Sequence, residues 1–100
     1  MLDPATVVVR AIEPLESAIE DGLMLCDVET GDILTLNATA RVIWEATADR
    51  VAISAICAKL QSRYAVEGAQ CLEAVTAALN ELELRGFVRL TPPGALVESR

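Results

Sequence analysis

The sequence of 100 residues contains no histidine, so it lacks the commonest general base and the commonest metal ligand of proteins. Its three cysteines, Cys26, Cys57 and Cys71, include no C-x-x-C pair, and their odd number predicts neither a disulfide framework nor a zinc knuckle. Each cysteine has apolar neighbours, and we expect each to serve as a small core residue. A glycine-rich phosphate loop is also missing. These absences argue against an enzyme and predict no metal and no cofactor.

Basic residues are few: one lysine and seven arginines stand against fifteen acids, and the formal net charge is −7. The first fifty residues hold ten of the acids and only three of the arginines. A nucleic-acid partner needs clustered cations that displace phosphate counterions, so we expect none. The apolar runs fall far short of the roughly 20 residues of a membrane span, and the N-terminus lacks the features of a signal peptide. We therefore expect a cytoplasmic protein without membrane contact.

Apolar residues, in contrast, are abundant and make up 53% of the chain, with only five glycines and four prolines. This composition is typical of a folded domain and excludes disordered or linker-like classes. A length of 100 residues leaves room for one core. We expect a single domain over residues 1–100, with a core from about 5 to 90 and a tail over 91–100.

The first third of the chain predicts β-structure. Residues 5–13 are rich in β-branched side chains and stop at Pro14, as a strand would. The apolar runs 23–28 and 33–36 flank the turn-forming residues 29–32, which is hairpin spacing. We expect these three strands to form one antiparallel sheet. The acidic residues near the first turn are expected in a solvated loop that could steer a basic ligand: Glu13, Glu16, Glu20 and Asp21.

The remaining two thirds predict three helices. Asn37 is a good N-cap, and residues 38–48 continue from it as a helix. Apolar residues recur at helical spacing over 53–64 and again over 69–85. Gly86 then stands where a left-handed residue ends a helix, before a short closing strand over 87–90.

This order predicts an α+β fold similar to a winged helix-turn-helix, in which an N-terminal three-stranded antiparallel sheet is followed by three helices. Folds of that kind often read DNA through the third helix. Here that helix would approach the phosphates with three acids and one base, so a protein partner fits better. The residues concerned are Glu73, Glu81, Glu83 and Arg85.

Several residues give the chain a resemblance to the PqqD-like family, which takes its name from the peptide chaperone of pyrroloquinoline quinone biosynthesis. The resemblance covers roughly residues 22–90 and depends on the order and spacing of weak motifs. The chain departs from the family pattern at residues 49–52, where members often show Asp-Gly followed by a threonine cap. The matching positions are Gly31, Leu36, Asn37, Ala38, Ile43, Trp44, Leu60, Tyr64, Leu82, Gly86 and Phe87.

The resemblance implies a non-catalytic module that recognises the leader of a ribosomally made precursor peptide and presents it to a modifying enzyme. That enzyme would be a radical-SAM protein, or a leader protease or cyclase. The leader would add a β-strand beside residues 33–36, in a groove next to the third helix. The candidate edge is Asp32, Ile33, Leu34, Thr35 and Leu36. The candidate groove floor is Ala74, Val75, Ala78, Leu79 and Leu82.

Other interpretations remain open at this level. At least half of the apolar residues of the third helix must be core for a domain of this size to be stable. Alternation does not tell whether Leu34 and Leu36, or Ile33 and Thr35, face inward. Trp44 is expected as a core anchor rather than a partner contact. A winged-helix transcription regulator and an adaptor for a folded protein are the alternative functions, and a monomer and a homodimer are both compatible with the sequence.

Overall fold

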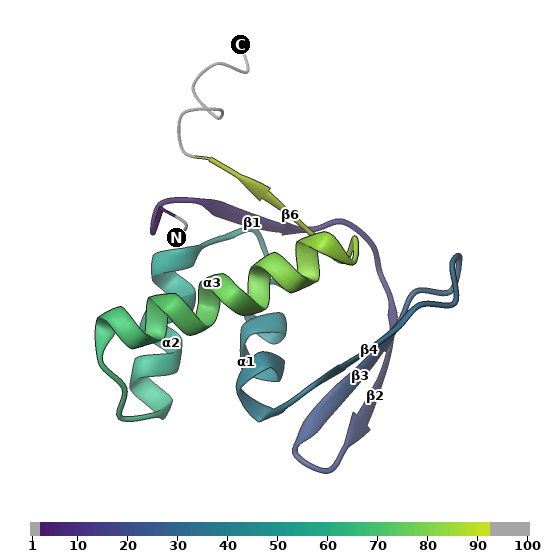
Figure 1. Cartoon of the computed structure of the whole chain (residues 1–100), viewed down its shortest axis with the longest axis horizontal. Helices are drawn as coiled ribbons and strands as arrows, with labels where there is room; N and C mark the ends of the chain where they lie inside the picture. Colours follow the sequence, from purple (N-terminus) through teal and green to yellow (C-terminus); the bar gives the residue numbers. More distant parts are fainter. Residues whose placement is uncertain (1–2, 93–100) are drawn as a thin grey trace.

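The computed structural model describes residues 3–92 and shows an α+β fold, which confirms the predicted class. Four strands precede the first helix where three were expected, and a short strand that was not expected separates the first two helices (Figure 1). A closing strand follows the third helix, as predicted. The elements are β1 (Val7–Arg10), β2 (Leu15–Ile19), β3 (Gly22–Cys26), β4 (Ile33–Leu36), α1 (Ala38–Ala46), β5 (Val51–Ala52), α2 (Ile53–Arg63), α3 (Gly68–Leu84) and β6 (Val88–Thr91).

The prediction of one three-stranded sheet is wrong, because β1 does not pair with the hairpin strands. It lies between β5 and β6 in an antiparallel sheet of its own, with Val8 opposite Leu90. In this position Val8 is fully buried, so the apolar face of β1 packs against the core. Figure 1 shows β1 and β6 together along one side of α3. Thr91, predicted as the start of a tail, belongs to β6, and residues 93–100 of that tail lie outside the described residues.

The second sheet has the order β2-β3-β4 and is antiparallel throughout. Its strand β2 occupies the middle of the stretch predicted as a solvated loop, so that prediction is wrong for Glu16. Glu13, Glu20 and Asp21 lie outside the strands, as predicted. All five residues of β2 are exposed, so the strand lacks the apolar alternation that reveals a half-buried strand in a sequence. A two-residue turn joins it to β3, with Ile19 opposite Gly22 and a positive φ of 55° at Glu20.

The three helices lie within two residues of their predicted bounds. The side chain of Asn37 accepts a hydrogen bond from the Ala40 amide at 2.8 Å, which confirms the predicted N-cap of α1. Tyr64 terminates α2 with an extended backbone. Gly86 has a φ of 84°, as predicted for the residue that ends α3. Within the described residues, no helix is both long and apolar enough to cross a membrane.

The core lies where the helices meet the inner faces of the two sheets. The indole of Trp44 is fully buried, which confirms its predicted place in the core. It meets Phe87 edge to face, with ring centroids 6.3 Å apart and an interplanar angle of 88°. The other largest buried side chains come from both sheets and from α1, α2 and α3: Val8, Leu25, Ile43, Ile53, Ile56, Val75, Leu79 and Leu82.

Candidate functional site

Strand β4 forms one edge of its sheet, because among residues 3–92 it pairs with β3 alone. The Asp27 amide donates to the Asp32 carbonyl at 2.9 Å. In the antiparallel register with β3, the even-numbered residues of β4, Leu34 and Leu36, therefore direct their main-chain groups toward β3. The odd-numbered residues, Ile33 and Thr35, therefore direct theirs away from the sheet. These groups could pair with a further strand.

The side chains of β4 alternate between two environments. Leu36 is 6% exposed and lies opposite Leu23 on the inner face, whereas Ile33 is 52% exposed on the outer face. Leu34 is half-buried and packs against the core, and Thr35 is exposed. The structure thus decides the open question of orientation: Leu34 and Leu36 face inward.

The predicted groove floor on α3 divides into two groups. Val75 and Leu79 are fully buried and Leu82 is 1% exposed, so these three side chains serve the core and do not line an open groove. The reason is that α1, α2 and β6 all pack against α3 and cover its apolar stripe. Ala78 is half-buried and Ala74 is exposed. Of the five predicted floor residues, these two alanines remain accessible to a ligand.

A cavity of about 190 Å³ opens beside Ala74, between the beginning of α1, the end of α2 and the first half of α3. Two of its large hydrophobic side chains, Tyr64 and Val66, are more than a third exposed. Val66 escaped sequence reasoning because it lies in the loop after α2, where no periodic pattern marks a residue. The cavity is lined by Thr39, Leu60, Tyr64, Val66, Gln70, Cys71 and Ala74.

Arg85, at the end of α3, contacts the beginning of β4. Its Nε donates to Oδ2 of Asp32 at 2.9 Å and its Nη2 to Oδ1 at 2.8 Å, a bidentate ion pair. The same Nη2 also donates to the Ile33 carbonyl at 3.0 Å. The hydrogen bond from Arg85 is the main cause that lowers the pKa of the Asp32 carboxyl. Sequence reasoning missed Arg85 as a neighbour of the edge, because 53 residues separate it from Asp32.

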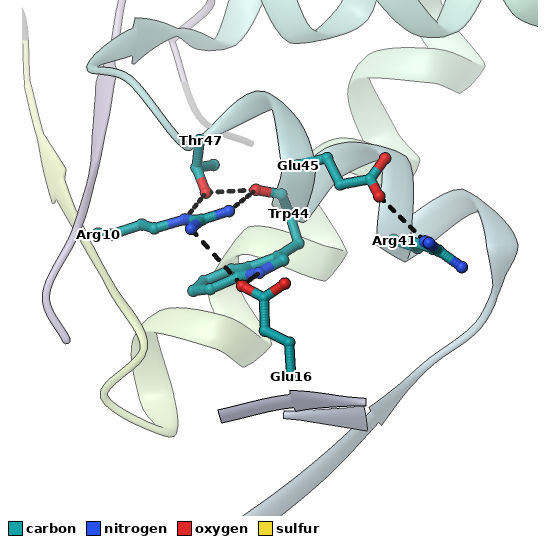
Figure 2. A network of polar contacts seen from close by, with 6 residues as sticks. All are labelled: Arg10, Glu16, Arg41, Trp44, Glu45 and Thr47. Carbon is teal, nitrogen blue, oxygen red and sulfur yellow. Dashed lines mark hydrogen bonds and ion pairs between the residues drawn. The ribbon is translucent and has the colours of Figure 1, made fainter. Parts of the chain in front are cut away.

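A polar network connects the two sheets around Trp44 (Figure 2). The indole Nε1 donates to the Glu16 carboxylate at 2.9 Å, and the Arg10 guanidinium lies 3.9 Å from the ring centroid. Arg10 also donates to Oγ1 of Thr47 at 3.0 Å and to the Trp44 carbonyl at 2.8 Å. Glu16 therefore has a structural partner, unlike the solvated loop acid that we expected. The network supports the fold and lies away from the outer edge of β4.

The three cysteines form no disulfide with one another. All three are free thiols: Cys71 is buried, as expected, whereas Cys26 and Cys57 are half-buried. Burial, together with the neighbouring Cys71 thiol, raises the pKa of Cys57 to about 11, which disfavours a reactive thiolate. Cys71 Sγ donates to the Cys57 carbonyl at 3.5 Å. Among residues 3–92, no group of three potential ligands is placed to hold a metal ion.

Comparisons with known proteins give one solved structure of similar fold and one matching protein family. A solved structure described as "TbiB1 in Complex with the TbiA(beta) Leader Peptide" matches with a TM-score of 0.66 and 18% sequence identity, over 88% of this chain and 93% of that one. The two proteins therefore share a fold. No curated protein matches the sequence significantly. The family model of PqqD, described as coenzyme PQQ synthesis protein D, matches residues 22–88. That range is well over half of the sequence, and the chain belongs to the PqqD family.

Proposed function

We propose that this protein binds the leader segment of a precursor peptide as an added strand along β4 and presents the peptide to a separate modifying enzyme. The observation that carries the proposal is the open edge of β4, with the outward main-chain groups of Ile33 and Thr35, close to the cavity beside Ala74. Family membership supports it, as does the leader peptide in the solved structure of similar fold.

Strand addition explains how so small a site can hold a peptide. Main-chain hydrogen bonds to Thr35 and to the Ile33 amide would supply affinity whatever the peptide's side chains are. The cavity beside Ala74 would add selectivity, because an apolar side chain of the peptide loses its contact with water there. Neither step needs a cofactor or a metal.

The rest of the proposal concerns the chain as a whole. Residues 1–100 would form one binding domain without catalytic residues, and the chemistry would belong to a radical-SAM protein or to a leader protease or cyclase. The winged-helix likeness would serve peptide binding rather than DNA reading. Exposed acids on α3, among them Glu73 and Glu81, oppose the approach of a phosphate backbone. Cytoplasmic location is part of the same proposal.

The proposal is tested with synthetic peptides of about 20 residues, taken from the N-terminal halves of short reading frames beside the gene. Isothermal calorimetry should show that at least one of these peptides binds the protein. Its affinity should be the same before and after addition of a chelator. Thr35→Pro removes an outward donor of β4 and should weaken binding at least tenfold. Ala18→Pro is the matched control, because the register places its amide on the opposite outer edge of the same sheet.

A second pair of variants tests the cavity. Ala74→Glu places a carboxylate beside the cavity and should weaken binding at least fivefold, because an apolar side chain would then meet a charge. Ala77→Glu changes an exposed alanine of α3 that does not line this cavity, and should bind as the wild type does. The proposal fails if no peptide of the panel binds, or if folded Thr35→Pro and Ala74→Glu variants both keep wild-type affinity.

A further inference from the structure

The outer edge of β4 is not equally open along its length. Ile33 and Thr35 each direct one amide and one carbonyl outward, and the Ile33 carbonyl already accepts a hydrogen bond from Arg85 at 3.0 Å. The guanidinium is held there by its two hydrogen bonds to Asp32 and by a weaker contact with Glu81 at 3.3 Å. An added strand that extends past Ile33 would therefore meet an occupied acceptor and a fixed planar cation.

Stability alone is a poor explanation for this arrangement. The Arg85 and Asp32 side chains are 31% and 39% exposed, and ion pairs so open to water contribute little to the free energy of unfolding. What the fork geometry does provide is a defined position, because the planar guanidinium binds a carboxylate and a carbonyl at once. That position is at the Ile33 end of the strand edge, within hydrogen-bond distance of the Ile33 carbonyl.

The other end of β4 leads to the cavity. Thr39, in the first turn of α1 after β4, lines the cavity together with Ala74 of α3. From Ala74 to Arg85 the helix axis advances by about 16 Å, at 1.5 Å per residue. An extended peptide covers the same distance with about five residues. Figure 1 agrees with this layout, since α3 ends on the side where β4 begins and α1 starts where β4 ends.

We propose that Arg85 is a specificity-determining end stop, which limits strand addition to the stretch between Ile33 and the cavity. The inference rests on the proposed function and goes further by naming the class of peptide. That peptide carries an apolar anchor residue for the cavity and an extended stretch of about five residues, after which its chain leaves the sheet at Arg85. Arg85 acts as a positioning residue, since it sets the register and length of the pairing.

The experiment uses the tightest-binding peptide of the calorimetric panel and a version shortened by two residues at the end near Ile33. Hydrogen exchange of the peptide amides, followed by NMR, reports which peptide residues pair with β4. With the wild type, shortening should change the affinity less than twofold. With Arg85→Gln, two further peptide amides should become protected, and shortening should then weaken binding at least fivefold. Arg89→Gln, an exposed arginine of β6, is the matched control.

Arg85→Lys is measured in parallel, so that the end stop is still tested if the Arg85→Gln variant does not fold. Lysine retains the charge but cannot hold Asp32 and the Ile33 carbonyl in one planar fork, so the protected stretch should lengthen here too. An identical protected stretch in the wild type and in the folded Arg85 variants overturns the end stop and leaves the proposed function intact. Failure of every peptide to bind the wild type overturns the proposed function itself, and the end stop with it.

Discussion

At the scale of single residues, Asp32 and Arg85 show how a surface pair acquires a role through its geometry. Both side chains are about one third exposed, and water screens their attraction. Their two parallel hydrogen bonds nevertheless favour the charged form of Asp32 and bring the guanidinium to the edge of β4. The pair therefore matters for the site more than for the free energy of unfolding.

The first residue-scale prediction concerns the ionisation of Asp32. Its pKa should lie below the ordinary value of 3.8, because Arg85 donates hydrogen bonds to the carboxylate. A carboxyl whose pKa is lower in the folded state than in the unfolded state stabilises the fold above the unfolded pKa. That contribution is lost as the pH falls below 3.8 and through the folded pKa.

NMR titration of the Asp32 side-chain carboxyl measures this shift directly. Arg85→Gln should raise the pKa of Asp32 toward its ordinary value, whereas Arg89→Gln should leave it unchanged. A titration of Asp32 that is the same in the wild type and in Arg85→Gln would show that the ion pair does not form in solution.

At the scale of elements, the β2-β3-β4 sheet depends on one close approach. An added Cβ at Gly22 would collide with the Leu36 carbonyl oxygen, so the beginning of β3 can lie against the end of β4 only without a side chain. The same position closes the two-residue turn from β2. The close approach lies where β4 passes into α1, three residues before Thr39 of the cavity.

Gly22→Ala should therefore lower stability by about 1–3 kcal/mol, because the backbone of β3 or β4 must shift to admit the methyl group. Thermal denaturation followed by circular dichroism checks this. Gly31→Ala tests a different cause, since Gly31 has open space around it but a φ of 78°. Its cost should come from backbone strain alone and amount to about 1 kcal/mol. Unchanged stability in Gly22→Ala would contradict the close approach.

At the scale of the whole molecule, two sheets that share no strand are held together through α1. Arg10 comes from β1 and Glu16 from β2, and both contact Trp44 of α1. Thr47, only 1% exposed, donates to the Trp44 carbonyl and accepts from Arg10. Figure 2 shows this network, which links β1 of one sheet to β2 of the other through Trp44.

Arg10→Met keeps the apolar stem of the side chain and removes its hydrogen bonds, so it should destabilise the protein by about 1–3 kcal/mol. For a domain of this length each kcal/mol lowers the Tm by about 4–8 °C. Arg50→Met, a change at an exposed arginine, is the control and should leave the Tm nearly unchanged. Equal Tm values for the two variants would mean that the network contributes no stability.

Local pattern was sufficient to predict the helices, the hairpin of β3 and β4, and the family. The helices and the hairpin depend on neighbours within a few residues, such as the N-cap at Asn37, the apolar spacing along α2 and α3, and the left-handed Gly86. The family resemblance depends on the order and spacing of such motifs along residues 22–90. Such signals act through backbone geometry and burial, which a short stretch of sequence already expresses. The extent of β4 was predicted for the same reason, whereas its choice as the candidate edge came from the family resemblance.

Long-range packing decided the rest. Whether β1 pairs with the hairpin or with β6 is a choice between partners up to 84 residues away, and the pairing with β6 is the one that accompanies the burial of Val8. β2 is exposed throughout and becomes a strand only because β3 supplies its hydrogen bonds. Arg85 reaches Ile33 because α3 ends beside β4. Pairing, burial and contacts of this kind are properties of the folded chain. They arise between segments that are distant in the sequence, and the local pattern of one segment does not depend on the other.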